Sequence, residues 1–299
     1  MYMRRVRLAA LLAAPAIGGT YALAQPKAQA WPAMLTPTVG VPATRCSSGD
    51  TDAILNYQKP HVSAVSSRRD LEGSDDSLHG ADWDYRHVVI RNGRKLERAP
   101  TLDKAGFELV EDRLDHVDYY CEESVTSTYY QQCEELMTKV TGARFVRAFD
   151  HNVRSASGQA AGKKLRGGNA VQGPAGIVHG DYTADSAPRR FKLLGQPPKL
   201  NDALKKKLGE QPLVDSETIE EALTGKRRYA LINVWRPIKP VACKPLACAD
   251  ASTVVGDELI VFSIHYADRV GENYFAKWPR SGEHAWSFFP EMTPDGEWP

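Results

Sequence analysis

Short apolar segments separated by turn residues fill the second half of the chain, and this pattern constrains the fold more than any other feature. Residues 257–266 alternate between two apolar faces, and the turn at residues 269–271 separates them from residues 272–277. Alternation with a period of two is typical of β-strands. We predict further strands at residues 229–238 and 284–289. Short strands at this close spacing predict a closed or double-sheet β architecture such as a jelly roll.

The first half of the chain mixes helix and strand signals. A helix is predicted over residues 117–140, because apolar side chains recur there at helical spacing and Gly142 can end it. A second, short helix is predicted for residues 216–223, before Gly225. Strands are predicted at residues 87–90, 101–110 and 145–151, and a polar loop or extended arm at residues 47–82. The predicted fold class is therefore mainly β with flanking helices (α+β).

The first 45 residues have the composition of a leader segment. No Asp or Glu precedes Asp50, arginines precede the apolar residues 8–14, and the segment 28–30 reads Ala-Gln-Ala. A basic start, an apolar stretch and an A-x-A site are typical of a secretory signal peptide. An organelle transit peptide and a wrongly assigned start codon, which would leave a cytoplasmic protein, stay open as alternatives. We predict a single domain over residues 46–299.

Charge and hydropathy argue against two classes of partner. The formal net charge of the 299 residues is +1, which gives no electrostatic footprint for nucleic acid. No stretch of about 18 apolar residues occurs, so no membrane span is predicted. The five cysteines are scattered, and Cys243 and Cys248 are more simply interpreted as small buried residues than as metal ligands.

A histidine and an aspartate separated by one glycine indicate a metal site. On a strand, residues i and i+2 point to the same face, so His179 and Asp181 can face one ion while Gly180 points away. With His284 they would form a 2-His-1-carboxylate triad, which leaves positions open for substrate and O₂. The spacing alone is a weak signal. The glycine-rich basic residues 155–176 just before it suit either a lid or a solvated loop.

Six short segments stand in a fixed order along the chain. They are T-G-A at 141–143, F-D-H-N-V-R at 149–154, H-G-D-Y-T at 179–183, N-V-W-R-P-I at 233–238, P-L-A-C-A-D-A at 245–251 and H-A-W-S-F-F-P-E-M-T-P-D at 284–295. In this order they resemble the AsaB-like hydroxylase/desaturase family, which includes fungal gibberellin desaturase and CmcJ, a component of cephamycin 7α-methoxylation. The resemblance covers about residues 85–295.

This resemblance implies a non-haem iron(II) oxygenase on a double-stranded β-helix, cupin-like in form. Such enzymes commonly use 2-oxoglutarate and O₂ to hydroxylate or desaturate a small, secondary-metabolite-like substrate. By position, the resemblance also implies His179, Asp181 and His284 as the Fe(2+) ligands. Tyr182 and Thr183 match the aromatic residue and threonine that follow the family's aspartate, and Thr183 is a candidate contact for the co-substrate.

The distal carboxylate of 2-oxoglutarate needs a cation, and arginine binds carboxylates with two parallel hydrogen bonds. No arginine follows His284, so Arg236, which matches the family's strand arginine, is the first candidate. Its alternative role is that of a buried structural arginine paired with an acid such as Asp250. Arg154 and Arg147 are the next candidates.

Other polar and aromatic residues have structural interpretations. Asp150 and His151 are expected to pack near the site rather than to bind metal, and Trp235 and Trp286 suit either a pocket wall or the core. In the family, the last segment leads into a further strand that this chain lacks, so we expect the last strand of the fold to be missing. Two other functions therefore stay open: a non-catalytic β-barrel binding protein, and an accessory subunit of a methyltransferase.

Overall fold

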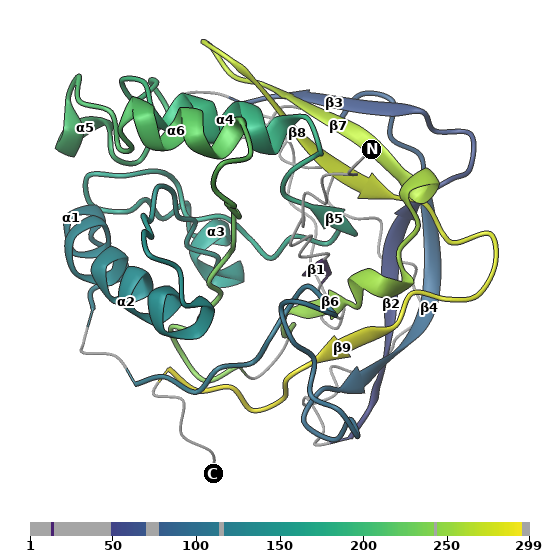
Figure 1. Cartoon of the computed structure of the whole chain (residues 1–299). Helices are drawn as coiled ribbons and strands as arrows, with labels where there is room; N and C mark the ends of the chain where they lie inside the picture. Colours follow the sequence, from purple (N-terminus) through teal and green to yellow (C-terminus); the bar gives the residue numbers. More distant parts are fainter. Residues whose placement is uncertain (1–12, 15–48, 70–77, 114–116, 242–243, 295–299) are drawn as a thin grey trace.

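The protein folds into two curved β-sheets with helices gathered on one side of them (Figure 1). The computed structural model describes residues 13–14, 49–69, 78–113, 117–241 and 244–294. Of the predicted leader, only Ala13–Ala14 is among them. Within this part of the chain, one sheet has the order β1-β6-β9-β4-β2 and the other the order β3-β7-β8-β5. The strands are β1 (Ala13–Ala14), β2 (Thr51–Gln58), β3 (Ala64–Arg68), β4 (Trp83–Asn92), β5 (His179–Gly180), β6 (Ala247–Ala249), β7 (Leu259–His265), β8 (Val270–Ala276) and β9 (Trp286–Phe288).

The helices confirm the predicted class, mainly β with flanking helices. They are α1 (Glu122–Ser124), α2 (Tyr130–Thr141), α3 (Ala156–Ala160), α4 (Ser186–Leu194), α5 (Lys205–Leu208) and α6 (Ser216–Leu223). A π-helical turn, Val125–Tyr129, joins α1 to α2, and 3-10 turns lie at Ala251–Thr253 and Gly256–Glu258. None of the helices that the structure describes is both long enough and apolar enough to span a membrane.

Strands β2 and β4 form an antiparallel pair that packs on the main core. Ala53, Leu55 and Tyr57 of β2 alternate onto the core face, and the last two have no exposed surface. The prediction of a loop or arm over residues 47–82 is therefore wrong for β2 and β3, and residues 70–77 lie outside the described part. The apolar alternation of β2 is short and lies in a polar segment, which hid it. The predicted strand at residues 87–90 is confirmed as part of β4.

Strands β7 and β8 form the antiparallel pair that their turn residues predicted. Ile260, Phe262 and Ile264 are buried on one face of β7, while Val261 on the other face is 37% exposed. Strand β5 pairs with β8 at the sheet edge, with His179 opposite Phe275. This pairing fixes the position of the H-x-D segment in the fold.

Two helix predictions are confirmed in their positions. Residues 117–140 contain α1, the π-helical turn and most of α2, which ends at Gly142 in the left-handed conformation (φ 66°) that glycine adopts without strain. The apolar stripe that predicted this helix is only half-buried, because Tyr129, Cys133, Leu136, Met137 and Val140 all keep some exposure. Helix α6 has the predicted bounds, and the Asp215 carboxylate caps it by accepting from the Thr218 N–H.

Three predicted strands do not form. Residues 101–110, 145–151 and 229–238 are all described, and none of them joins a sheet. Their apolar side chains are used in packing instead: Phe149 packs on the cluster that α4 and α6 form, and Ile238 packs on the cluster around Val153. An apolar pattern predicts burial, whereas a strand also needs a pairing edge that only the tertiary fold supplies.

Candidate metal site

His179 lies at the end of a strand that the core anchors. The preceding residues Ile177 and Val178 are buried in the two main hydrophobic clusters. The His179 Nδ1 lies 2.8 Å from the Ile177 carbonyl oxygen, and because a carbonyl only accepts, Nδ1 carries the hydrogen. The lone pair is therefore on Nε2, which lies 3.5 Å from Oδ1 of Asp181. This tautomer turns the ligating nitrogen toward the carboxylate.

The Asp181 carboxylate is held as an anion. Burial raises its pKa, but the interaction with His179 when its ring is protonated, the hydrogen bond from Asn233 and the charge of Arg154 outweigh burial, and its pKa lies below the usual value. The Asn233 side-chain amide donates to Oδ2. The side chain of Asp181 is 39% exposed, against 15% for His179. The site is thus partly open to solvent.

This donor set fits one divalent first-row metal ion. Neutral imidazole nitrogen and carboxylate oxygen are ligands that iron(II) and its neighbours accept. The 3.5 Å between His179 Nε2 and Asp181 Oδ1 is less than two metal–ligand bonds of about 2.1 Å each, so both atoms can reach one ion. The fold therefore places the His179 and Asp181 side chains next to each other, as the sequence predicted.

His284 is not brought to this pair. Its Nδ1 lies 3.0 Å from the Tyr57 hydroxyl and its Nε2 3.0 Å from Glu258 Oε2, and its side chain is fully buried. A ligating histidine needs one ring nitrogen with a free lone pair and an open path to the metal. Among the described residues, no group of three His, Cys, Asp or Glu side chains is arranged to hold a metal. The triad predicted from sequence is thus not assembled through His284.

Arg236 takes the structural role that the sequence left as its alternative. Its guanidinium donates to the Asp112 carbonyl at 3.0 Å, to the Pro294 carbonyl at 3.2 Å and to Asp112 Oδ2 at 3.3 Å. The paired acid is Asp112 rather than Asp250, whose carboxylate caps the 3-10 turn Ala251–Thr253. This partly buried ion pair engages the Arg236 guanidinium.

Arg154 is the candidate arginine whose charge acts on the site. It contributes to the low pKa of Asp181, its side chain is exposed, and it donates to the Gly173 carbonyl at 2.9 Å. Arg147, the remaining candidate, instead lies 3.6 Å from Glu134 on the helical side of the molecule.

Thr183 is a structural residue and not an open contact. It is 2% exposed, and its hydroxyl accepts from the Ser186 N–H at 2.9 Å and donates to Glu272 at 3.2 Å. The Ser186 hydroxyl in turn accepts from the Thr183 N–H at 2.8 Å. These bonds fix the chain between Asp181 and α4, so Thr183 positions the site without facing it.

The remaining predicted residues are mostly structural. His151 Nδ1 lies 2.9 Å from the Tyr130 hydroxyl, which agrees with the expected packing role, and Trp286 is 1% exposed in the core. Trp235 is 37% exposed. Cys248 is buried as predicted, and burial raises the pKa of its thiol to about 12. Cys243 lies outside the described residues.

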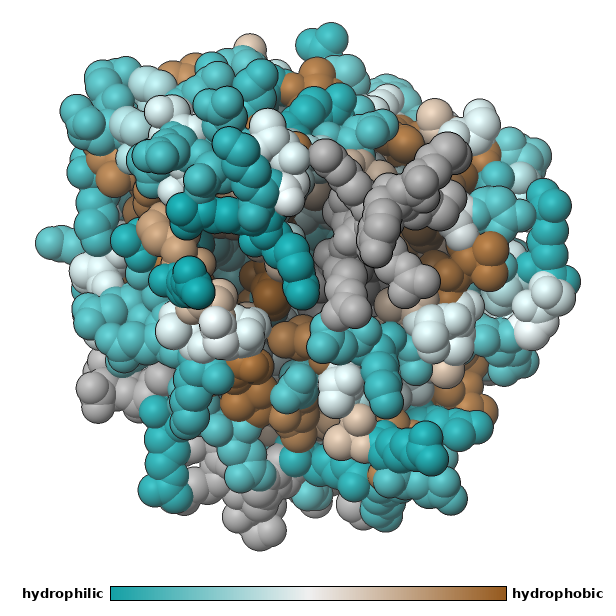
Figure 2. All heavy atoms as spheres, viewed as in Figure 1, coloured by the Kyte–Doolittle hydropathy of each residue, from teal (hydrophilic) through white to brown (hydrophobic). Residues whose placement is uncertain are grey.

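The face of the molecule in Figure 2 is hollowed near its middle, between the helices and the sheets, and hydrophobic side chains show at the hollow. Asn233, Arg154 and Trp235 are exposed residues.

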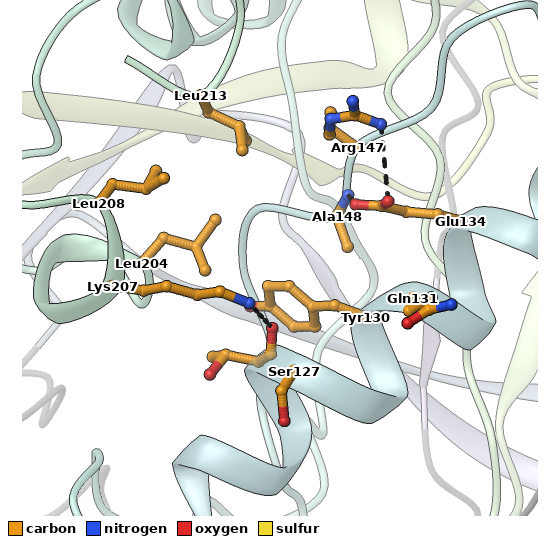
Figure 3. Close-up of a pocket in the computed structure, with 11 residues that line it drawn as sticks. Ser127, Tyr130, Gln131, Glu134, Arg147, Ala148, Leu204, Lys207, Leu208 and Leu213 are labelled. Atoms are coloured by element: carbon orange, nitrogen blue, oxygen red, sulfur yellow. Dashed lines mark hydrogen bonds and ion pairs between the residues drawn. The ribbon is translucent and has the colours of Figure 1, made fainter. Parts of the chain in front are cut away.

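A separate cavity of about 400 Å³ lies among the helices (Figure 3). Leucines line one side of it, and the ion pair of Arg147 with Glu134 lies across from them. Lys207 donates to the Thr126 carbonyl at 3.0 Å, so its charge is already engaged. The lining contains neither His179 nor Asp181; it consists of Thr126, Ser127, Tyr130, Gln131, Glu134, Arg147, Ala148, Leu204, Lys207, Leu208 and Leu213.

Comparison with known proteins links this geometry to oxidoreductases. A family described as an oxidoreductase/YMDC permease-like domain matches residues 55–298. The hydroxylase/desaturase efuI of Hormonema carpetanum is 30% identical over 222 residues, covering 71% of this chain and 70% of that protein. The alpha-ketoglutarate-dependent dioxygenase phiK of Fungal sp. (strain ATCC 74256) is 26% identical over 255 residues, covering 85% of this chain and 82% of that protein.

A solved structure shares the fold. The iron and alpha-ketoglutarate-dependent endoperoxidase NvfI superposes with a TM-score of 0.55 at 18% sequence identity, covering 83% of this chain and 82% of that one. Enzymes of this kind have a double-stranded β-helix, so the predicted fold is confirmed.

Proposed function

Because this chain belongs to the oxidoreductase family whose match spans residues 55–298, we propose that it is an iron(II)- and 2-oxoglutarate-dependent dioxygenase that hydroxylates or desaturates a small molecule. Relatives named hydroxylase/desaturase and alpha-ketoglutarate-dependent dioxygenase support the reaction class. The observation that carries the proposal is the orientation of His179 Nε2 toward the Asp181 carboxylate.

In this proposal, His179 Nε2 and Asp181 Oδ1 are two of the iron ligands, and His284 is not the third. Iron(II), when bound with 2-oxoglutarate, activates O₂ for removal of hydrogen from a C–H bond. The protein's part is to hold the two ligands in a fixed tautomer and charge state. The Ile177 carbonyl orients the imidazole, and burial of Ile177 and Val178 keeps the strand that carries it in place.

We assign Arg154 to the distal carboxylate of the co-substrate. It is the predicted arginine whose charge reaches Asp181 and whose side chain is exposed, and it bonds to a backbone carbonyl that helps to orient it. Arg236 does not meet these conditions, because it is not among the charges that lower the pKa of Asp181 and its side chain is only 10% exposed.

Replacing Arg154 with glutamine is expected to raise the KM for 2-oxoglutarate by about 10- to 100-fold, because a hydrogen bond to a charged group contributes about 1.5–3 kcal/mol. The measurement is the rate of succinate formation against 2-oxoglutarate concentration. Arg236→Gln is the matched control and is expected to lower stability with little effect on this KM. A raised KM in Arg236→Gln, with Arg154→Gln unchanged, would reverse the assignment.

The proposed function is tested by iron-dependent turnover. Purified protein supplied with iron(II), ascorbate, O₂ and 2-oxoglutarate is expected to release succinate, and a panel of small apolar substrates is expected to accelerate this release. Omission of iron or addition of a chelator should remove the signal. A protein that neither binds iron(II) nor forms succinate would end the proposal and leave the non-catalytic binding protein.

We also propose that residues 46–299 form one oxygenase domain and residues 1–45 a leader for export or organelle import. The family match over residues 55–298 supports this boundary, and the absence of acids before Asp50 supports the leader. The substrate class is a small molecule, with O₂ as the second substrate.

A further inference from the structure

The amide side chain of Asn233 contacts the Asp181 carboxylate, and the sequence predicted no role for Asn233. It lies 52 positions from Asp181 in the chain, and its Nδ2 donates to Oδ2 of Asp181. The other carboxylate oxygen, Oδ1, faces His179 Nε2 at 3.5 Å. The two oxygens of Asp181 therefore have different partners on their two sides.

The segment that carries Asn233 is held in place on its C-terminal side. Arg236, three residues later, is bound to Asp112 and to the Pro294 carbonyl, Pro237 is buried, and Ile238 packs on the cluster around Val153. Val153 directly precedes Arg154 in the chain. Asn233 is thus presented from a fixed segment, although this segment belongs to neither sheet.

We propose that Asn233 is a positioning residue that keeps Asp181 a one-oxygen ligand of the metal. A carboxylate can bind a metal through one oxygen or through both. An amide hydrogen on Oδ2 occupies that oxygen and holds the carboxylate plane, so only Oδ1 is presented beside His179. The coordination position that Oδ2 would otherwise occupy then remains available to the co-substrate and O₂. This inference rests on the proposed function.

The expected effect follows from how partners of metal ligands act. Substituting such a partner typically lowers metal affinity about 10- to 100-fold. Without the amide hydrogen, Asp181 can rotate and bind through both oxygens, which displaces one metal-bound water. A merely structural role of Asn233 would lower stability or affinity but would not change the number of waters on the bound ion.

The test uses the full chain and manganese(II), a stand-in for iron(II) whose bound waters are counted by water-proton relaxation. Asn233→Leu keeps the side-chain size and Asn233→Ala removes it; both lose the donor. Each variant is expected to bind manganese(II) about 10- to 100-fold more weakly, with a lower relaxation enhancement per bound ion. Asn169→Ala, an exposed asparagine elsewhere, is the control and should match the wild type.

The outcomes separate the two proposals. Unchanged affinity, or weaker affinity with unchanged relaxation, overturns the role of Asn233 while the metal site stands. A wild-type protein that binds no manganese(II) or iron(II) instead overturns the proposed function itself. Thermal unfolding of each variant shows whether the fold is kept. If one of the two variants is unfolded, the other is used for the metal-binding measurement. If both are unfolded, Asn233 has a structural role and the proposal is overturned.

Discussion

Replacing His179 with alanine is expected to abolish iron-dependent succinate formation and to weaken metal binding by more than about 100-fold. The magnitude exceeds the 10- to 100-fold that loss of a ligand's partner typically causes, because here a ligand itself is removed. Among the residues that the structure describes, His179 and Asp181 are the two side chains brought together for a metal, so no other described imidazole beside them compensates. The measurements are manganese(II) affinity and succinate release at saturating 2-oxoglutarate.

The control for this experiment is His87→Ala, an exposed histidine on β4 whose loss should change neither readout. The stability of His179→Ala should stay close to that of the wild type, since its ring contacts a backbone carbonyl two residues away and a partly exposed carboxylate. Retention of iron-dependent turnover in His179→Ala would contradict the assignment of this residue as a ligand.

Replacing His284 with alanine is expected to lower the free energy of unfolding by about 1.5–3 kcal/mol, the contribution of a hydrogen bond to a charged group. Nε2 of His284 lies 3.0 Å from the Glu258 carboxylate, and both side chains are almost completely buried. Trp286 Nε1 donates to the Tyr57 hydroxyl at 2.9 Å, which leaves the Tyr57 hydrogen to donate to Nδ1. Removing the imidazole leaves Glu258 buried and without this partner.

The measurement is urea unfolding, with manganese(II) affinity determined at low temperature, where the variant stays folded. Affinity is expected to stay near the wild-type value, in contrast to His179→Ala. The double variant His284→Leu/Glu258→Leu is expected to lose less stability than the sum of the single changes, because neither partner is then left unpaired. If His284→Ala instead lost metal binding without losing stability, His284 would be the third ligand after all.

Local patterns allowed much of the fold to be predicted. The turn at residues 269–271 and the alternation of β7 gave the β7–β8 pair, and the spacing in α6 gave its bounds. These predictions depend on short segments of sequence, because strand and helix periodicity can be recognised within a few consecutive residues. The strand β2 was missed because its apolar alternation consists of only three side chains, Ala53, Leu55 and Tyr57, within a polar segment.

The sequence likewise predicted only those features of the candidate site that depend on neighbouring residues. The sequence predicted His179 and Asp181 together because two positions on one strand share a face. The motif at residues 233–238 contains both Asn233 and Arg236, which was the available signal for Asn233, but the predicted role went to Arg236. Asn233 contacts Asp181, which lies 52 positions away, and Arg236 contacts Asp112, which lies 124 positions away. No local pattern could predict contacts over such distances in the chain.

By itself, the sequence determined the mainly β fold class, the family resemblance and the His179–Asp181 pair, because each depends on residues close together in the chain or on an ordered set of motifs. Only the tertiary structure decided that His284 is a core residue bonded to Tyr57 and Glu258. A histidine at a strand end has the same local pattern whether it faces a metal or a buried carboxylate. Which of these it meets depends on the packing of strands that lie far apart in sequence.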